Sequence, residues 1–497
     1  MESIFNKYLS AVKNTETILY TGHVTAVKGM MIESNGPRSV IGEICTIKMP
    51  YNNTQILAEV MGFEGKTVKL MAYDSTEGIE IGNEIIASGH VLQVPVGKEL
   101  LGRVIDACGN PIDGKGPLEA KVFYPVLANA PNPITRKPID RRIITGVRAI
   151  DSLFTCGKGQ RLGIFAGSGV GKSTLLSMIA RNTNADINVI GLIGERGREV
   201  NDFIQRDLGE EGMKRSVVVV ATSDATSISR LRAAYTTTAV AEYFRDQGKD
   251  VMLMMDNLTR FAHAQREIGL STGEAPAQRG YPPSVFDMIP KLLERTGTND
   301  RGSITAFYNV LVDGDDVDEP ITDKVRGTID GHIFLTRKLA EQRHFPAIDP
   351  LKSISRLARR VSGTQTLKAV TKVSRLIAIY EDNRDMIMAG VYQKGANAEV
   401  DAAIDKHGEI EKFLCQEEDE HCTIEDTLQK LSALAEIEIP ESEYDENPAA
   451  SRKTVAELVH KHKEEKVEVE NVKAGENFSG AKIAEKMSEI SSKLENK

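Results

Sequence analysis

The sequence predicts a multidomain α/β protein in which a parallel sheet flanked by helices lies between an amino-terminal β-barrel and a carboxy-terminal helical domain. Its 497 residues, 41% of them hydrophobic, are too many for one core. Short β-rich runs come first, apolar runs alternating with helical segments follow, and amphipathic segments come last. The expected domain boundaries are residues 1–95, 96–350, 351–439 and 440–497.

The amino-terminal part alternates short β-rich runs, such as ICTIKM and TVKLMAY, with Gly, Pro and Asn. This pattern, between residues 20 and 96, is typical of a small all-β domain of the barrel type. Residues 111–138 are rich in Pro, Gly and Asn and show no steady period. We expect them to form a connector between domains without packed secondary structure.

Continuous apolar runs such as RLGIFA, INVIGLI and DVMLMMD separate segments of helical composition between residues 143 and 350. Runs of this kind predict parallel strands that are buried on both faces of a sheet. From residue 351 to 439 the sequence has the pattern of amphipathic helices, for example VSRLIAIYEDNRDMIMA. The third domain is therefore predicted to be helical.

The last stretch, residues 440–497, is a charged extension rich in Glu, Lys and Ser. Ile483, Met487, Ile490 and Leu494 recur at heptad-like spacing, which is typical of a helix that docks on a partner helix. The charged composition favours the alternative, a solvated and partly disordered tail.

Composition argues against membrane-spanning, secreted and nucleic-acid-coating proteins. No window holds the roughly 18 uninterrupted apolar residues of a membrane span, and the first residues lack the apolar core of a secretory signal. We therefore expect a cytoplasmic protein. The net charge of −9 argues against a surface that coats nucleic acid, so no nucleic-acid partner is expected.

The five cysteines lie at irregular spacing, which favours free thiols in a reducing compartment. Cys415 and Cys422, with His407 and His421 nearby, raise the alternative of a metal cluster. Their spacing matches no zinc pattern, so we interpret them as ordinary residues of the helical domain.

The segment RLGIFAGSGVGKSTLLSMIA joins a buried-strand run, a glycine-rich turn and a helix, which is the context of a phosphate-binding loop. Glycines permit the turn, whose backbone N–H groups bind phosphate. Lys172 is expected to contact the β- and γ-phosphates of ATP, and the Ser173 hydroxyl to coordinate Mg²⁺. Ala166 stands where the usual pattern has its first glycine. The predicted nucleotide-binding residues of this loop are Gly167, Ser168, Gly169, Val170, Gly171, Lys172, Ser173 and Thr174.

The apolar run VMLMMD ends in Asp256, which places a carboxylate at the carboxyl end of a predicted strand beside the phosphate-binding loop. An aspartate there holds Mg²⁺ through water in this class of site. The alternative is an acidic turn residue that merely ends the strand. Beside a phosphate-binding loop, we favour the role of metal ligand.

Hydrolysis needs a group that orients and deprotonates water, and the turn GERGREV supplies Glu195 as the candidate base. Arg196, the next residue, is a candidate to brace this carboxylate or to contact phosphate oxygens, as is Arg198. A solvated charge cluster ahead of a helix is the alternative. Spacing alone does not separate the two.

The motifs AGSGVGKST, GERGREV, DNLTRFAHAQREIGL, APAQRGYPPSVF and HFPAIDPLKSISR occur in this order, and together they resemble the flagellar and type III protein-export ATPases. These are relatives of the catalytic subunit of the rotary F-type ATPase. The resemblance covers roughly residues 20–435 and implies an amino-terminal β-barrel, a RecA-like P-loop domain and a helical carboxy-terminal domain. The forms of GERGREV and RGYPPSVF favour the export branch over the rotary synthases.

The resemblance also implies site residues that spacing alone does not. Phe345 in HFPAID matches an aromatic position that stacks on adenine, and Arg356 in SISR matches an arginine that reaches the nucleotide of a neighbouring subunit. The predicted catalytic residues are therefore Glu195, Lys172 and Arg356, which the resemblance implies, and Arg196, which is a candidate from its place beside Glu195. The chain departs from the family at Asn257, where serine is usual, at Lys324, and in its carboxy-terminal extension.

The function implied is Mg²⁺-dependent ATP hydrolysis that energises flagellar protein export, by a homohexamer at the cytoplasmic face of the export gate. The implied partners are regulatory or stator proteins, central-stalk export proteins and chaperone–substrate complexes, with peripheral membrane association through such partners. The alternatives are a virulence-type secretion ATPase, a catalytic subunit of a rotary F- or V-type ATPase, a hexameric RNA helicase of the termination-factor type, and a module that binds nucleotide without hydrolysing it.

Overall fold

The computed structural model describes residues 19–51, 53–312 and 319–448. The heptad-like residues Ile483 to Leu494 lie outside the described residues. The domains described below belong to one compact unit that ends at Asn447. In the described part of the chain, no helix combines the length and the apolar character needed to span a bilayer.

The amino-terminal strands close into a barrel, in the order β1-β2-β5-β4-β3-β6, so the predicted barrel is confirmed. Alternate side chains point inward, as Cys45 and Ile47 do from β3, and they form the barrel's own core. The barrel strands are β1 (Thr21–Lys28), β2 (Met31–Ser34), β3 (Glu43–Met49), β4 (Thr54–Glu64), β5 (Thr67–Ala72) and β6 (Glu84–Val91).

The connector differs from the prediction, because part of it forms paired strands. Within residues 111–138, strand β9 (Val122–Pro125) pairs antiparallel with β7 (Gln93–Val96). The short β8 (Val104–Ile105), which precedes the connector, joins the central sheet. The ring of Tyr124 packs edge-on against Tyr243, with the ring centroids 5.5 Å apart. Contacts with the next domain therefore order a stretch whose local sequence shows no period.

The central sheet has the order β19-β18-β12-β17-β15-β13-β14-β8, and the short β16 pairs with β17 beside this path. The pairs are parallel except those of β19 with β18 and of β16 with β17, which are antiparallel. Both faces of the sheet are buried, because alternate residues of a strand belong to different hydrophobic clusters. In β14, Val217 and Val219 belong to one cluster, and Val218 and Val220 belong to the other. The other strands are β12 (Arg161–Ala166), β13 (Ile187–Glu195), β14 (Ser216–Thr222), β15 (Asp250–Asp256), β16 (Gly297–Thr298), β17 (Ser303–Leu311), β18 (Gly331–Leu335) and β19 (Ile354–Ser355).

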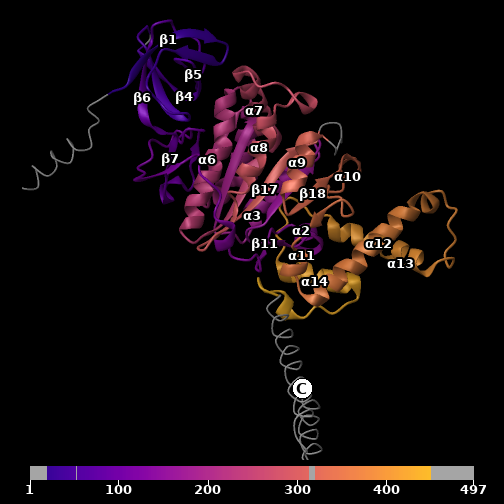
Figure 1. Cartoon of the computed structure of the whole chain (residues 1–497). Coiled ribbons are helices and arrows are strands. Elements are labelled where there is room, and N and C mark those ends of the chain that lie inside the picture. The colour runs from indigo at the N-terminus through magenta and orange to yellow at the C-terminus, as the bar shows by residue number, and fades with distance from the viewer. Residues whose placement is uncertain (1–18, 52, 313–318, 449–497) are drawn as a thin grey trace, which may run out of the picture. The chain divides into compact units, whose positions relative to one another are not determined.

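Helices cover both faces of this sheet (Figure 1), which confirms the predicted α/β layers. Residues of α6 and α7 share one cluster with the strands, and residues of α3 share the other. The helices of this domain are α2 (Arg148–Leu153), α3 (Lys172–Asn182), α4 (Gly197–Asp202), α5 (Gly209–Lys214), α6 (Ser227–Asp246), α7 (Leu258–Thr272), α8 (Pro283–Leu293), α9 (Pro320–Thr328) and α10 (Arg337–Glu341). A short strand pair, β10 (Arg142–Ile143) and β11 (Cys156–Gly157), flanks α2.

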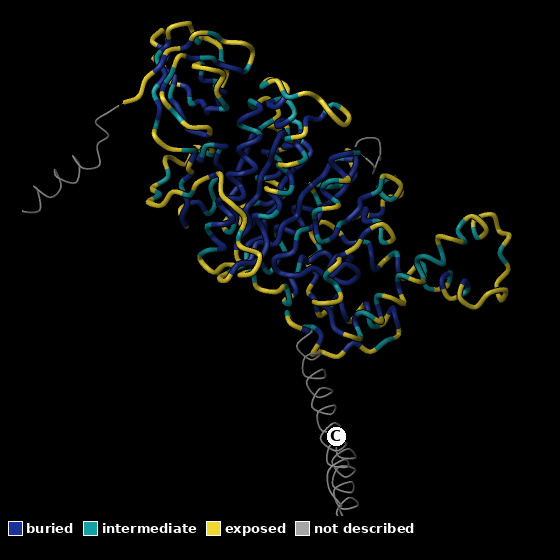
Figure 2. The backbone as a smooth tube through the Cα atoms, viewed as in Figure 1, coloured by how far each residue is buried: buried dark blue, intermediate teal, exposed yellow. Residues whose placement is uncertain are grey.

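The third domain is helical, as predicted, and its core residues join the cluster that contains α3. In Figure 2 the distal ends of α12 and α13, and the loop between them, are largely exposed. The helices of the domain are α11 (Ala358–Val361), α12 (Thr364–Met388), α13 (Ala398–Leu414) and α14 (Ile424–Ala435).

The start of the predicted extension packs on the folded unit. The buried carboxylate of Glu443 accepts hydrogen bonds from the backbone N–H groups of Gln365 and Thr366, so it caps the amino terminus of α12. Glu446 pairs with Lys158 at 2.9 Å. We therefore propose that the charged extension begins a few residues later than residue 440.

Candidate active site

The glycine-rich loop connects the carboxyl end of β12 to the start of α3, so its backbone N–H groups lie at a helix amino terminus. Gly169 and Gly171 have φ angles of 78° and 91°, in the left-handed region that glycine enters without strain. Ala166, which replaces the usual first glycine, is the last residue of β12 and is buried. The loop thus has the conformation that its sequence predicts.

Lys172, the first residue of α3, meets Asp256 at the carboxyl edge of the sheet. Its Nζ lies 2.5 Å from Oδ1 of Asp256, which ends β15 and is only 3% exposed. Burial lowers the pKa of the Lys172 ammonium, but the negative charges of Asp256 and Glu195 outweigh this effect and raise it. Lys172 therefore keeps its positive charge inside the site.

Glu195 ends β13, the strand beside β15, and completes a cluster with these two residues. Its Oε1 lies 3.9 Å from Nζ of Lys172 and accepts a hydrogen bond from Nδ2 of Asn257 at 2.8 Å. Burial raises the pKa of Glu195 to about 7, with a further contribution from the charge of Asp256, while Lys172 and Asn257 act in the opposite direction. A carboxylate with a pKa near neutrality is suited to accept a proton from water.

Asn257 is a site residue that sequence reasoning missed, because we regarded it only as a departure from the family. Its Oδ1 accepts a hydrogen bond from the backbone N–H of Arg260 and so caps α7, while its Nδ2 holds Glu195. The available signal was an N-cap residue directly after Asp256, the aspartate predicted to hold the metal.

Arg196 lies outside the cluster. Its side chain is 82% exposed and pairs with Glu199 at 3.4 Å, and Arg198 pairs likewise with Asp202. This arrangement matches the alternative interpretation of the sequence, a solvated charge cluster ahead of a helix. Among the described residues, the Arg196 side chain pairs with neither Glu195 nor the phosphate-binding loop, although its partner Glu199 hydrogen-bonds the Glu195 carboxyl.

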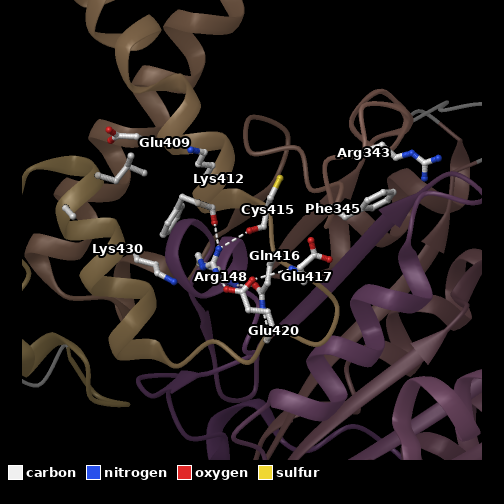
Figure 3. Close-up of a pocket in the computed structure, with 13 residues that line it drawn as sticks. Arg148, Arg343, Phe345, Glu409, Lys412, Cys415, Gln416, Glu417, Glu420 and Lys430 are labelled. Carbon is white, nitrogen blue, oxygen red and sulfur yellow. Dashed lines mark hydrogen bonds and ion pairs between the residues drawn. The ribbon is translucent and has the colours of Figure 1, made fainter.

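Phe345 lies beside the loop, since a side chain at Gly171 would be 3.7 Å from its ring. It also lines a cavity of about 650 Å³ (Figure 3), in which Phe345 and Arg343 lie on one side and Lys412 of α13 on the other, with Arg148 between them. The ring therefore lies near the phosphate-binding loop, as the predicted role of Phe345 requires.

Comparisons with known proteins agree with this architecture. The model of the β-barrel domain of the ATP synthase α/β family matches residues 24–89, and the model of the nucleotide-binding domain of that family matches residues 146–355. A model of the carboxy-terminal domain of the type III secretion ATPase EscN matches residues 363–433. The chain is 56% identical to the flagellum-specific ATP synthase of Treponema pallidum, over 87% of this chain and 97% of that protein. This chain belongs to the flagellar and type III secretion ATPases of the ATP synthase α/β family.

Other members of this family match at lower identity. The type 3 secretion system ATPase of Xanthomonas euvesicatoria is 46% identical, over 84% of this chain and 94% of that protein. The structure of assembled EscN from enteropathogenic E. coli matches with a TM-score of 0.79 at 44% identity, over 83% of this chain and all of that chain. EscN in complex with its central stalk EscO matches with a TM-score of 0.78 at 43% identity, over the same shares of the two chains.

Arg356, the arginine that the family resemblance singles out, lies apart from the Lys172 cluster. It follows the edge strand β19, its backbone N–H donates to the carbonyl of Asp330, and its side chain is exposed. No residue that the structure describes pairs with its guanidinium. The side chain is thus free to contact another molecule.

The oxygen atoms at the cluster fit Mg²⁺. Asp256 offers a carboxylate and Ser173 an exposed hydroxyl next to Lys172, and hard oxygen donors of this kind are the ligands Mg²⁺ prefers. The residues of the alternative metal cluster have other contacts: Cys422 contacts Arg148, His421 contacts Asn182, and His407 stacks on Tyr380. Within the described ranges, no group of three or more His, Cys, Asp and Glu residues is placed to bind a metal.

Proposed function

We propose that this chain hydrolyses Mg²⁺·ATP in the cluster of Lys172, Glu195 and Asp256, and that the energy drives flagellar protein export. The observation that carries the proposal is the position of Glu195, a carboxylate with a pKa of about 7 held 3.9 Å from the lysine of the phosphate-binding loop. A module that only binds nucleotide has no need of such a base.

Each residue has a stated task in this proposal. The N–H groups of residues 167–173 and the ammonium of Lys172 bind the phosphates, and Phe345 stacks on adenine. Glu195 accepts the proton of the attacking water, and Asn257 fixes the carboxylate in position. Ser173 and Asp256 would hold Mg²⁺, which when bound neutralises part of the phosphate charge.

We further propose that the chain works as a homohexamer in which Arg356 of one subunit reaches the nucleotide of the next. Its exposure directly after the edge strand β19 supports this role. EscN, which shares this fold, is described as an assembled ATPase that binds a central stalk, EscO. By analogy the proposed partners are a central-stalk protein, regulatory or stator proteins and chaperone–substrate complexes, which would attach the ring peripherally to the inner face of the cell membrane from the cytoplasm.

Sequence identity favours a flagellar over a virulence apparatus. The chain is 56% identical to a flagellum-specific relative and 46% identical to a type 3 secretion relative over similar shares of its length. Restoration of swimming by this chain in cells that lack their own flagellar ATPase would support the flagellar assignment. Restoration of virulence secretion alone would contradict it.

The experiment that tests hydrolysis compares the purified chain with Lys172→Ala and with Lys291→Ala, a matched control at a lysine of α8 outside the cluster. We expect Lys172→Ala to lose turnover and the control to keep it, because Lys172 is the cation of the phosphate-binding loop. Absence of turnover in the unaltered chain, with nucleotide binding intact, would instead favour the non-hydrolysing module. Stimulation of turnover by RNA would favour the helicase.

A further inference from the structure

The connection between α13 and α14 contacts the Phe345 segment through Gln416. The backbone N–H of Gln416 donates a hydrogen bond to the carbonyl of Phe345 at 2.9 Å. A second contact lies one residue away, where Nδ1 of His344 is 2.8 Å from Oε2 of Glu411 in α13. The segment that carries the Phe345 ring is therefore held by the helical domain.

The side chain of Gln416 fixes the position of that backbone N–H group. It is 4% exposed, and each of its polar atoms has a partner. Its Oε1 accepts from the backbone N–H of Arg148 at 2.8 Å, and its Nε2 donates to the carbonyls of Gly146 and Glu420 at 2.9 and 3.0 Å. These partners determine the orientation of the amide, because only its oxygen can accept and only its nitrogen can donate.

The same amide therefore joins the turn before α2 to the α13–α14 connection, whose N–H group holds the Phe345 carbonyl. Gly146 and Arg148 belong to the turn that begins α2, whereas Glu420 belongs to the α13–α14 connection. Arg148 adds hydrogen bonds to the carbonyls of Phe413 and Cys415, on either side of the end of α13 (Figure 3). Phe345 itself is 39% exposed, so its own packing leaves it room to move.

We propose that Gln416 is a positioning residue for nucleotide binding: its side-chain amide anchors the N–H group that holds the Phe345 carbonyl and so keeps the ring in place for the base. This inference rests on the proposed function, and in particular on base stacking by Phe345. The hydrogen bonds of Gln416 go to Phe345, Arg148, Gly146 and Glu420, and none of these lies in the Lys172 cluster. Loss of the Gln416 side chain should therefore reduce only the contribution of the base to the affinity for ATP.

The test measures binding of two probes, ATP and inorganic tripolyphosphate, to the full chain by titration calorimetry. Gln416→Ala should weaken ATP binding about tenfold, within the range that base–aromatic stacking contributes, and leave tripolyphosphate binding unchanged. The KM for ATP should rise with kcat nearly constant. Gln429→Ala, at an exposed glutamine of α14, is the matched control and should change nothing.

An equal loss for both probes would show that Gln416 only supports the fold, and an unchanged ATP affinity would also overturn the inference. A double-mutant cycle with Phe345→Ala separates the remaining outcomes. If Gln416 acts through Phe345, Gln416→Ala should have little further effect in the Phe345→Ala background, and full additivity would contradict the inference. If Phe345→Ala alone leaves ATP affinity unchanged, base stacking fails together with this inference, while hydrolysis by the Lys172 cluster stands.

Discussion

The side-chain amide of Asn257 donates a hydrogen bond to Oε1 of Glu195 at 2.8 Å. The oxygen of the same amide caps α7 by accepting from the N–H of Arg260. One residue therefore serves both the start of a helix and the orientation of the candidate base. Serine, the residue that the family resemblance leads one to expect here, would retain a cap but has a shorter side chain without the amide.

Replacement Asn257→Ser should shift the pH dependence of turnover. The hydrogen bond from Asn257 lowers the pKa of Glu195, which burial raises to about 7. Since a base acts when deprotonated, kcat/KM should fall as the pH falls through this range, and loss of the hydrogen bond should move that fall to higher pH. The measurement is the pH profile of kcat/KM for both proteins. A shift to lower pH, or none, would contradict the role of Asn257.

Replacement Glu195→Gln should preserve Mg²⁺·ATP binding and lower turnover by about 10²- to 10⁴-fold, because the amide cannot accept the proton of water. Binding is measured by titration calorimetry and turnover by phosphate release. Glu211→Gln, at an exposed glutamate of α5, is the control and should retain full turnover. Equal losses of binding and turnover in Glu195→Gln would mean that Glu195 serves the site's structure rather than the proton transfer.

Replacement Glu59→Ala should destabilise the contact between the barrel and the sheet domain. Glu59 of β4 is 1% exposed and pairs with the buried Arg232 of α6, and it also accepts a hydrogen bond from Tyr73. Removing one partner leaves a buried charge uncompensated, at a cost of about 3–5 kcal/mol in the free energy of unfolding.

Urea denaturation measures this change, with Glu64→Ala as the control because the side chain of Glu64, which pairs with Lys69, is 74% exposed. Similar losses in the free energy of unfolding for the two variants would show that the buried pair contributes no more to stability than the Glu64 pair.

The elements of the central domain were predictable because their signals are local. The apolar runs of β12, β13 and β15 and the glycines of the loop each specify a conformation within a few residues. Strand β9 was not predictable, since its pairing with β7 and the packing of Tyr124 on Tyr243 join residues far apart in the chain.

The chemistry of the site was predictable only in part, for a related reason. Residue type and position at strand ends pointed to Lys172, Asp256 and Glu195, which the structure brings together. The exposure of Arg196 depends on how α4 begins, and the bond from Asn257 to Glu195 spans 62 positions of the chain. Neither can be read from a motif.

We propose that the active site is shared between subunits through Arg356. The most direct measurement is ATP turnover of the purified chain across protein concentration, with mass photometry on the same samples and Arg356→Ala alongside. Turnover per subunit should rise as hexamers form, and Arg356→Ala should assemble normally but hydrolyse about 10³-fold or more slowly, because an arginine finger supplies charge to the transferring phosphoryl group. Equal turnover by monomers and hexamers, or full activity of the assembled variant, would contradict the claim.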